Sequence, residues 1–258
     1  GGPTPWGTWL SCEEHPHGLV WECDPHGRTP ARSWPALGAF THEAVAIDPA
    51  TMQAYLTEDL ADGRWYRFTP DRRNTQTGVP DLSSGTLEAA HWDGESTGRV
   101  QWHRVEDPQG RDTPTRLQVP RATVFRGGEG CWYAQGTVFF TTKHDNRVWA
   151  FDIAKQSLRI LYDASRFADP VLFGVDNVTT SAAGDVVVAE DGGDMQIVAI
   201  TKDAVAPIVQ LEGHRQSEIT GPAFDPSGTR LYFSSQRGAT GDSGDGVTYE
   251  VSGPFLGS

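Results

Sequence analysis

Residues able to bind a metal recur at the ends of short β-rich runs in this 258-residue chain. Five such runs share one pattern, in which aromatic, branched or small apolar residues lead into small or hydroxyl residues and then polar ones. Aligning the runs gives one set at their ends: Cys12, Glu58, Thr142, Glu190 and Ser235. The next position holds a second set: Glu13, Asp59, Lys143, Asp191 and Gln236. We therefore take Cys12, Glu13, Glu58 and Glu190 as candidate metal ligands.

A further group of acids precedes these runs, at the expected start of the innermost strand of each repeat. It comprises Glu43 in the motif His42-Glu43-Ala44, Glu129 in Gly127-Gly128-Glu129-Gly130, the pair Asp176-Asn177, and Glu218. The alignment of this group is defined to within one residue. These five residues complete the set of candidate ligands.

Such a concentration of carboxylates requires cations if the side chains converge. Two like charges about 4 Å apart repel by about 1 kcal/mol in water and by several kcal/mol at a protein-like dielectric. Carboxylates with an Asn carbonyl suit Ca²⁺, and a thiolate among them suits a softer metal such as iron or zinc. The pattern indicates a metal cluster.

Each candidate also has a structural interpretation. Acids after strands commonly cap turns, and Asp59, Asp62 and Asp191 fit that role as well. Cys12 fits a small buried apolar position, and the three cysteines of the chain allow at most one disulfide. Arg126 either pairs bidentately with an anionic group or is a surface arginine. His42 is expected to orient a ligand beside it.

The elements that position these residues are predicted to be repeated β-strands. Each run is followed by a second run with strand alternation: Gly18–Cys23, Gly63–Phe68, Arg147–Phe151, Gln196–Ile200 and Gly246–Val251. A period of roughly 40–50 residues is typical of a β-propeller, in which inner strands meet at the mouth of a central channel. We predict an all-β fold with five or six blades of four antiparallel strands, five repeats being visible. A sandwich of irregular strands is the alternative.

One domain is expected over residues 1–258, with extra length at 70–125. There Gly85–Trp92 and Arg99–Val105 resemble one more hairpin, and the remainder reads as a surface excursion. Helical periodicity is confined to Asp163–Phe167. We expect the first repeat to begin at its second strand and the last to stop at its third, so that a piece upstream of Gly1 is missing.

The charge balance restricts the partners. The chain has 34 Asp and Glu against 21 Lys and Arg, a formal net charge of −13. This argues against nucleic-acid binding, which needs basic side chains to displace counterions, and favours cation binding or solubility alone. No apolar run is long enough to cross a bilayer, and the chain opens without the features of a signal peptide.

Several long motifs in this sequence resemble those of the PhoX-type alkaline phosphatases. They are Gly7–Glu14, Thr41–Ala44, Leu56–Asp59, Tyr66–Phe68, Leu82–Leu87, Gly127–Gly130, Asp176–Val178, Ala189–Gly193 and Gly253–Phe255. The family is longer at the N-terminus than this chain. The resemblance implies an exported, periplasmic or secreted β-propeller that hydrolyses small phosphomonoesters.

The same resemblance implies a calcium and iron (Fe³⁺) cluster in the channel. It makes Cys12 an iron ligand, and Glu43 and Glu129 iron or calcium ligands. It also places Asp176, Asn177, Glu190 and Glu218 in the cluster, with Arg126 on the phosphate. We expect a monomer.

Two other functions remain open from the sequence. A calcium-dependent lactonase of the gluconolactonase type is also a propeller, and Glu129 with Asp176-Asn177 would suit its single ion. A non-catalytic propeller that binds a partner on its rim would hold calcium only for stability.

Overall fold

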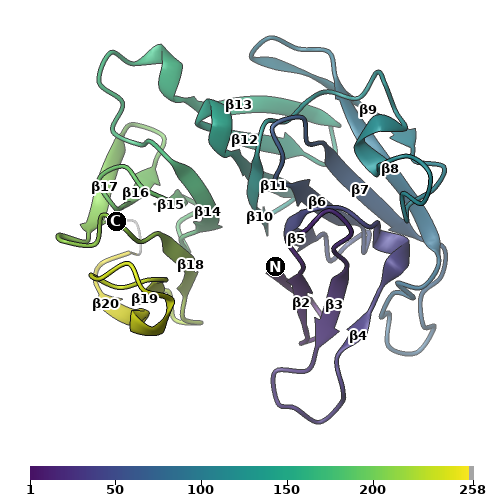
Figure 1. Cartoon of the computed structure of the whole chain (residues 1–258), viewed down its shortest axis with the longest axis horizontal. Helices are drawn as coiled ribbons and strands as arrows, with labels where there is room; N and C mark the ends of the chain where they lie inside the picture. The colour runs from purple at the N-terminus through teal and green to yellow at the C-terminus, as the bar shows by residue number, and fades with distance from the viewer. Residues whose placement is uncertain (256–258) are drawn as a thin grey trace. The chain divides into compact units, whose positions relative to one another are not determined.

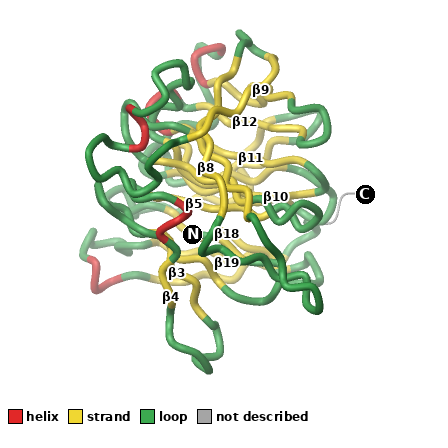
Figure 2. Tube along the Cα trace, turned by 90° about the vertical axis from the view of Figure 1, so that its right-hand side faces the viewer, coloured by secondary structure: helices red, strands yellow, loops and turns green. Residues whose placement is uncertain are grey.

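The computed structural model describes residues 1–255, and their regular secondary structure is almost entirely β-strand, joined by loops and turns (Figure 2). The helical residues of the described part lie in single-turn 3₁₀ helices: η1 (Pro35–Leu37), η2 (Thr115–Leu117), η3 (Lys143–Asp145), η4 (Ala164–Arg166) and η5 (Ser243–Asp245). The helical periodicity near Asp163–Phe167 is thus confirmed as one short turn. None of the described helices has the length and hydropathy to span a membrane.

The strands follow one another along the chain with few long interruptions. Their bounds are β1 (Gly2–Pro3), β2 (Trp9–Cys12), β3 (Val20–Cys23), β4 (Arg32–Ser33), β5 (His42–Ile47), β6 (Ala54–Glu58), β7 (Trp65–Pro70), β8 (Gly85–Trp92), β9 (Thr97–Arg104), β10 (Gly128–Ala134), β11 (Thr137–Thr142), β12 (Arg147–Asp152), β13 (Ser157–Asp163), β14 (Val175–Thr180), β15 (Val186–Glu190), β16 (Gln196–Ile200), β17 (Val205–Gln210), β18 (Ile219–Phe224), β19 (Arg230–Ser235) and β20 (Val247–Ser252). The five repeated pairs of runs therefore correspond to observed strands.

The chain forms two compact units. The first consists of Gly1–Phe140 and Trp149–Ile160, and the second of Thr141–Val148 and Leu161–Ser258. We describe each by itself, and the single domain expected over residues 1–258 stays a prediction.

The first unit contains a four-stranded sheet in the order β1-β2-β3-β4 (Figure 1). The expectation that the first repeat lacks its first strand is therefore wrong, because Gly2 and Pro3 pair with Leu10 and Trp9. This strand escaped notice because two residues are too few to show an alternating pattern.

A nine-stranded sheet runs in the order β10-β11-β12-β13-β9-β8-β7-β6-β5. The extra hairpin expected within residues 70–125 is present as β8 and β9, which pair antiparallel. β9 also pairs with β13, with Ser157 opposite Arg99, so the hairpin joins the four strands β10–β13 to the three strands β5–β7.

The second unit holds a four-stranded sheet, β14-β15-β16-β17, and a three-stranded sheet, β18-β19-β20. Within residues 1–255, the last repeat thus has three strands, as expected. Four strands per blade describe some of these sheets, and the number of blades stays a prediction.

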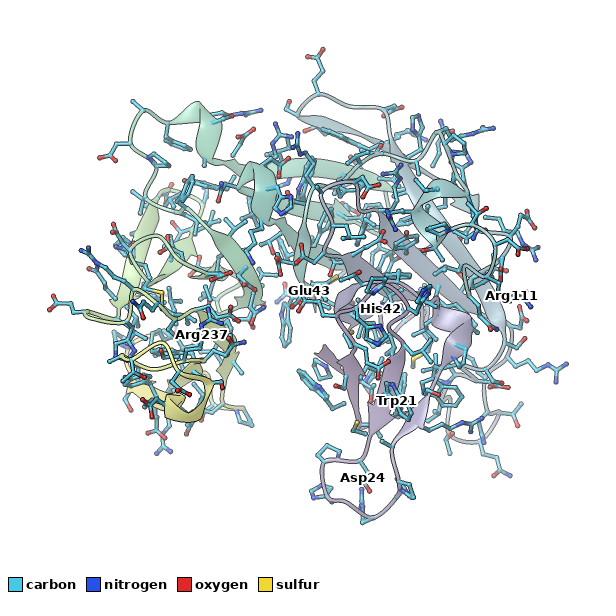
Figure 3. All side chains as sticks on the ribbon, in the orientation of Figure 1. Trp21, Asp24, His42, Glu43, Arg111 and Arg237 are labelled. Atoms are coloured by element: carbon cyan, nitrogen blue, oxygen red, sulfur yellow. The ribbon has the colours of Figure 1, made fainter. Side chains whose placement is uncertain are left out.

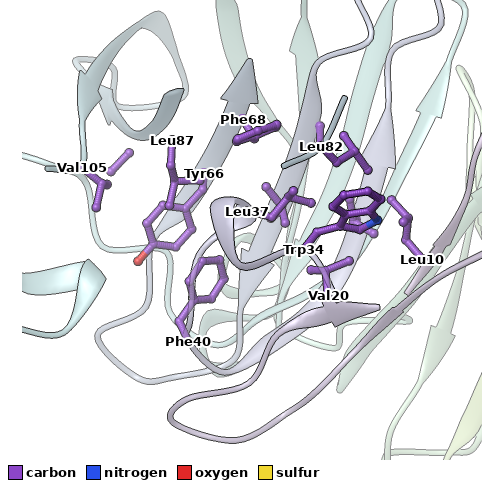
Figure 4. Packing of buried hydrophobic residues seen from close by; sticks show 14 of the residues in the cluster. Leu10, Val20, Trp34, Leu37, Phe40, Tyr66, Phe68, Leu82, Leu87 and Val105 are labelled. Carbon is purple, nitrogen blue, oxygen red and sulfur yellow. The ribbon is translucent and has the colours of Figure 1, made fainter. Parts of the chain in front are cut away.

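Alternation along the strands determines the core. In β2, Leu10 is fully buried while its neighbour Trp9 is 44% exposed. Leu10 packs with Val20, Trp34 and Leu37 in one apolar cluster (Figure 4). A second cluster surrounds Trp65.

Trp65 is the most connected aromatic side chain of that second cluster. Its ring stacks on Phe140 with centroids 4.5 Å apart and on Tyr55 at 5.6 Å. It also meets Phe151 edge to face at 5.1 Å. These contacts join β6, β7, β11 and β12 into one packed layer.

Replacing Trp65 by Ala is expected to lower the free energy of unfolding by about 3–5 kcal/mol, because a large buried ring leaves a cavity. Urea denaturation followed by circular dichroism measures this. The matched control is Trp9→Ala, which removes an exposed ring and should cost under about 1 kcal/mol. Equal losses for the two variants would contradict the packing described.

Candidate metal centre

Three glutamates at strand ends perform the same structural task. Glu13, Glu58 and Glu190 each accept a hydrogen bond from the backbone N–H six residues further along the chain. The acceptor is Oε2 in each case, and the distances are 2.9 Å to Leu19 N, 3.0 Å to Arg64 N and 2.9 Å to Gln196 N. Each carboxylate thereby satisfies a donor at or near the start of the following strand.

This shared hydrogen bond corrects the alignment of the first repeat. Glu13, rather than Cys12, occupies the position of Glu58 and Glu190, so Cys12 corresponds to Thr57. The sequence alignment was wrong by one residue because β2 and β6 end with similar small and polar residues. Only the hydrogen-bond register distinguishes the two choices.

Glu58 is the most deeply buried of the three. Its Oε2 also accepts a hydrogen bond from the Tyr66 hydroxyl at 2.8 Å, and its Oε1 lies 3.9 Å from the Arg116 guanidinium. Burial raises the pKa of Glu58 to about 7, against a usual value of 4.5. The buried site therefore favours the neutral carboxylic acid.

Glu190 and Glu13 differ in exposure. Glu190 is 1% exposed and accepts a second N–H, from Phe173, at Oε1. Burial raises the pKa of Glu190. The Glu13 side chain is 40% exposed, and the N–H of Leu19 is the main cause of its lowered pKa.

Two of the inner-strand acids, Glu43 and Asp176, lie in β-bulges. In β5 the pairing slips between His42 and Val45, around Glu43, and in β14 it slips between Val175 and Val178, around Asp176. A bulge inserts one unpaired residue and redirects its side chain, and bulges are frequent next to functional sites. Glu218 directly precedes β18, two residues before the corresponding position.

Threonines of neighbouring strands hold two of these acids. The Thr57 hydroxyl donates to the carbonyl oxygen of Glu129, and the Thr141 hydroxyl donates to that of Asp176. Glu129 and Asp176 are 3% and 5% exposed. The main chain that carries each buried carboxylate is therefore held by a threonine of another strand, Thr57 of β6 for Glu129 and Thr141 of β11 for Asp176.

Glu43 and Glu129 lie together in the first unit, and Cys12 is close enough to Glu43 for the Glu43 charge to act on its thiol. A carboxylate oxygen of Glu43 is within 4.8 Å of one of Glu129. The Cys12 thiol is not in a disulfide, and burial, with a smaller effect of the Glu43 charge, raises its pKa. Glu43 and the buried His42 are labelled in Figure 3.

A second group lies within the second unit. Carboxylate oxygens of Asp176, Asp191 and Glu218 are all within 4.8 Å of one another. Lys143 Nζ is 2.7 Å from Asp191, and Arg237 Nη2 is 3.3 Å from Glu218 and 4.0 Å from Asp191. Three negative charges therefore face two positive ones before any cation binds.

Sequence reasoning did not place Asp191, Lys143 and Arg237 in the site. Asp191 and Lys143 stood in the aligned set after the strand ends, which was the available signal. Arg237 reaches the acids from the turn after β19, and no spacing in the sequence indicates this.

Asn177 orients the neighbouring acid. Its amide nitrogen donates to Asp176 Oδ1 at 2.6 Å, while its own side-chain oxygen accepts the N–H of Gly221 at 2.7 Å. If Asn177 also bound a metal through this oxygen, as predicted, the oxygen would have to keep the hydrogen bond from Gly221.

His42 is structural. Its Nε2 donates to the carbonyl oxygen of Gly38 at 3.1 Å, and its ring stacks on Phe40 with centroids 3.6 Å apart. Burial lowers its pKa to about 3, so the ring is neutral. It holds the start of β5 in place beside Glu43.

Arg126 is exposed at the entry to β10, beside the turn that joins β6 to β7. The N–H groups of Phe125 and Gly127 donate to Gly63 and Leu60 of that turn. Gly127 has φ +67°, and a Cβ on Gly128 would lie 3.2 Å from the Glu58 backbone. The glycines thus permit a close approach, and within residues 1–255 Arg126 has no ion-pair partner.

The donor set of both groups suits hard cations. Carboxylate oxygens are the ligands preferred by Ca²⁺, and the thiol of Cys12 would favour iron beside them. Two of the carboxylates are almost completely buried, where clustered negative charge is least tolerable.

This arrangement occurs on a β-propeller-like fold. The structure of Pseudomonas fluorescens PhoX in complex with vanadate, a transition state analogue, matches with a TM-score of 0.74 at 16% identity, covering 94% of this chain and 65% of that one. A chain of the nidogen/laminin complex matches with a TM-score of 0.54 at 15% identity, covering 88% and 70%. At these identities the likeness shows the fold.

A comparison of the sequence with family models identifies the family. The family model of alkaline phosphatase PhoX matches residues 15–166, more than half of the chain. The chain belongs to the PhoX family. It spans 65% of the length of the Pseudomonas chain. No curated protein matches it significantly.

Glu58→Gln is expected to flatten the pH dependence of stability. The native pKa of about 7 exceeds the unfolded value of 4.5, so the native state binds the proton more tightly. The contribution of Glu58 to the free energy of unfolding is therefore fully present below about pH 4.5. It is lost as the pH rises from there through 7, by roughly 3 kcal/mol at most.

Urea denaturation with a chelator at several pH values between 5 and 8 measures this slope. Glu106→Gln, at an exposed carboxylate, is the control and should keep the slope of the parent. An unchanged slope in Glu58→Gln would contradict the assignment.

Proposed function

We propose that this protein is a metal-dependent hydrolase of phosphomonoesters. The observation that carries the proposal is membership of the PhoX family combined with buried acids at the inner-strand entries. Of these acids, Glu43 and Asp176 lie in bulges that turn them out of the ladder.

The proposed cations are Ca²⁺ and Fe³⁺. Glu43, Glu129 and Cys12 would hold them in the first unit, and Asp176 and Glu218 with Asp191 in the second. When bound, the cations supply Lewis acidity toward the phosphoryl oxygens. The ligand roles predicted for Glu13, Glu58, Glu190 and Asn177 stay predictions, since these side chains already hold backbone or side-chain hydrogen bonds.

The residues of the chain would do the remaining work. Arg126, exposed and without an ion pair in the described chain, would bind the phosphoryl oxygens bidentately and offset the charge of the transition state. Thr57 and Thr141 would keep Glu129 and Asp176 in position before substrate arrives. Such preorganisation avoids rearrangement during the reaction.

Other parts of the proposal come from the family resemblance. We expect a small phosphate ester as substrate, export to the periplasm or medium, a monomer and no nucleic-acid partner. The position at the mouth of a central channel and the five or six blades likewise stay predictions.

The alternatives gain no independent support. A gluconolactonase from Xanthomonas campestris matches with a TM-score of 0.43 at 13% identity, covering 90% of this chain and 66% of that one, which is too distant for an argument. A non-catalytic calcium-stabilised propeller differs from the proposal in having no hydrolytic rate.

Glu129→Gln is expected to lower both bound metal and hydrolysis of p-nitrophenyl phosphate, because a buried carboxylate ligand is lost. Elemental analysis of protein purified without chelator, and initial rates with added calcium, measure the two effects. Glu106→Gln should match the parent in both. A parent protein that is folded but holds neither calcium nor iron would refute the metal assignment, and turnover of a lactone panel instead would favour the lactonase.

Arg126→Gln is expected to lower kcat/KM by about 10²-fold while leaving the metal content unchanged, because only the transition-state contact is removed. The control, Arg121→Gln, removes another exposed arginine of the same loop and should retain activity. Equal rates for the two variants would exclude Arg126 from the site.

A further inference from the structure

Three arginines line one open pocket of the first unit, outside the candidate metal centre. The pocket has a volume of about 580 Å³, and Arg32, Arg72 and Arg73 contribute to its walls. The first belongs to β4, and the other two begin the connection between β7 and β8. In a chain with net charge −13, this grouping is unexpected.

The pocket lies at the opposite end of the strands from Glu43. Arg73 donates to the carbonyl oxygens of Ala50 and Thr51, in the turn between β5 and β6. Glu43 lies at the start of β5, and Glu58 at the end of β6, which is the other end of this antiparallel pair. The pocket is therefore a separate feature.

Two acids, Glu22 and Asp81, line the same pocket as the three arginines, and the charges of Arg32 and Arg72 act on Asp81. Glu22 accepts hydrogen bonds at Oε1 from Trp6 and Thr8, and at Oε2 from the Trp34 indole at 3.0 Å. Asp81 accepts from the backbone and hydroxyl of Ser83, which is the main cause of its lowered pKa. Both carboxylates are thus bound by uncharged donors.

The Arg32 side chain is oriented by stacking on Trp34. Its guanidinium lies over the Trp34 ring, 4.1 Å from the centroid, and the Trp34 side chain is fixed by Glu22. A stacked guanidinium keeps its N–H donors in the plane around its edge, where they match an oxyanion. Within residues 1–255, neither Arg32 nor Arg72 forms an ion pair.

The hairpin that carries the other two arginines is rigidly built. Arg73 and Pro80 form a β-bridge, and Asp81 N donates to Arg72 O at 2.9 Å. The Asn74 side chain caps the tip by accepting the N–H groups of Gln76 and Thr77. The arginines are therefore presented by an ordered element.

We propose that this pocket binds a phosphate group, either as inorganic phosphate or as part of an organic phosphate. The three guanidinium groups outnumber the two carboxylates that line the pocket, and their N–H donors suit the oxygens of a phosphate group. The volume lies in the range of ligand pockets, so an organic group also fits. The proposal does not depend on the hydrolase activity.

Calorimetric titration of the full chain with inorganic phosphate, and separately with phenylphosphonate, tests this. The protein carries Glu43→Gln and Glu129→Gln and is kept in chelator, so that the candidate metal centre does not contribute. We expect saturable binding of one equivalent, weakened at least about tenfold by Arg72→Gln or Arg32→Gln. Tighter binding of phenylphosphonate identifies an organic phosphate as the ligand, and tighter binding of phosphate identifies the free ion.

The matched control is Arg28→Gln. Arg28 is exposed in the loop between β3 and β4 and pairs with Asp24, outside the pocket (Figure 3 labels Asp24). It should leave the affinity within about twofold of the parent. Absence of saturable binding, or equal weakening by Arg28→Gln and Arg72→Gln, would overturn the proposal. Circular dichroism confirms that each variant is folded.

Discussion

Carboxylates at the strand ends need hydrogen-bond donors, and the backbone N–H groups near the start of the following strands need acceptors. One arrangement meets both requirements in three repeats, since Glu13, Glu58 and Glu190 each accept the N–H six residues further on. A buried polar group without a partner costs about 1–3 kcal/mol, so this pairing stabilises the turn at the end of each second strand. It also commits these acids to the fold.

The remaining acids are positioned differently, by bulges and by threonines. Glu43 and Asp176 leave the regular ladder, and the hydroxyls of Thr57 and Thr141 hold the main chain of Glu129 and Asp176. Within its own unit, each of these carboxylates lies close to other acids and does not make the strand-end hydrogen bond. The fold thus separates acids that build the repeats from acids available for cations, which is the basis of the proposed phosphatase chemistry.

Charge is also separated along the strands of the first unit. Glu43 and Glu129 lie at one end of their strands, and the pocket of Arg32, Arg72 and Arg73 lies at the other. The net charge of −13 hides this division, because it sums over both ends. Composition therefore predicts cation binding, but it gives no sign of the proposed anion site.

The sequence by itself determined the features that depend on local pattern. Alternation and turn residues predicted the repeated strand pairs, the β8–β9 hairpin and the acids at the inner-strand entries. Each of these features depends on the types of a few neighbouring residues. The two-residue β1, the one-residue shift that aligns Glu13 with Glu58, and the approach of Arg237 to Glu218 were decided only by the tertiary structure. They depend on pairing register and on contacts between segments far apart in the chain, and a one-residue difference in register leaves the local pattern almost unchanged.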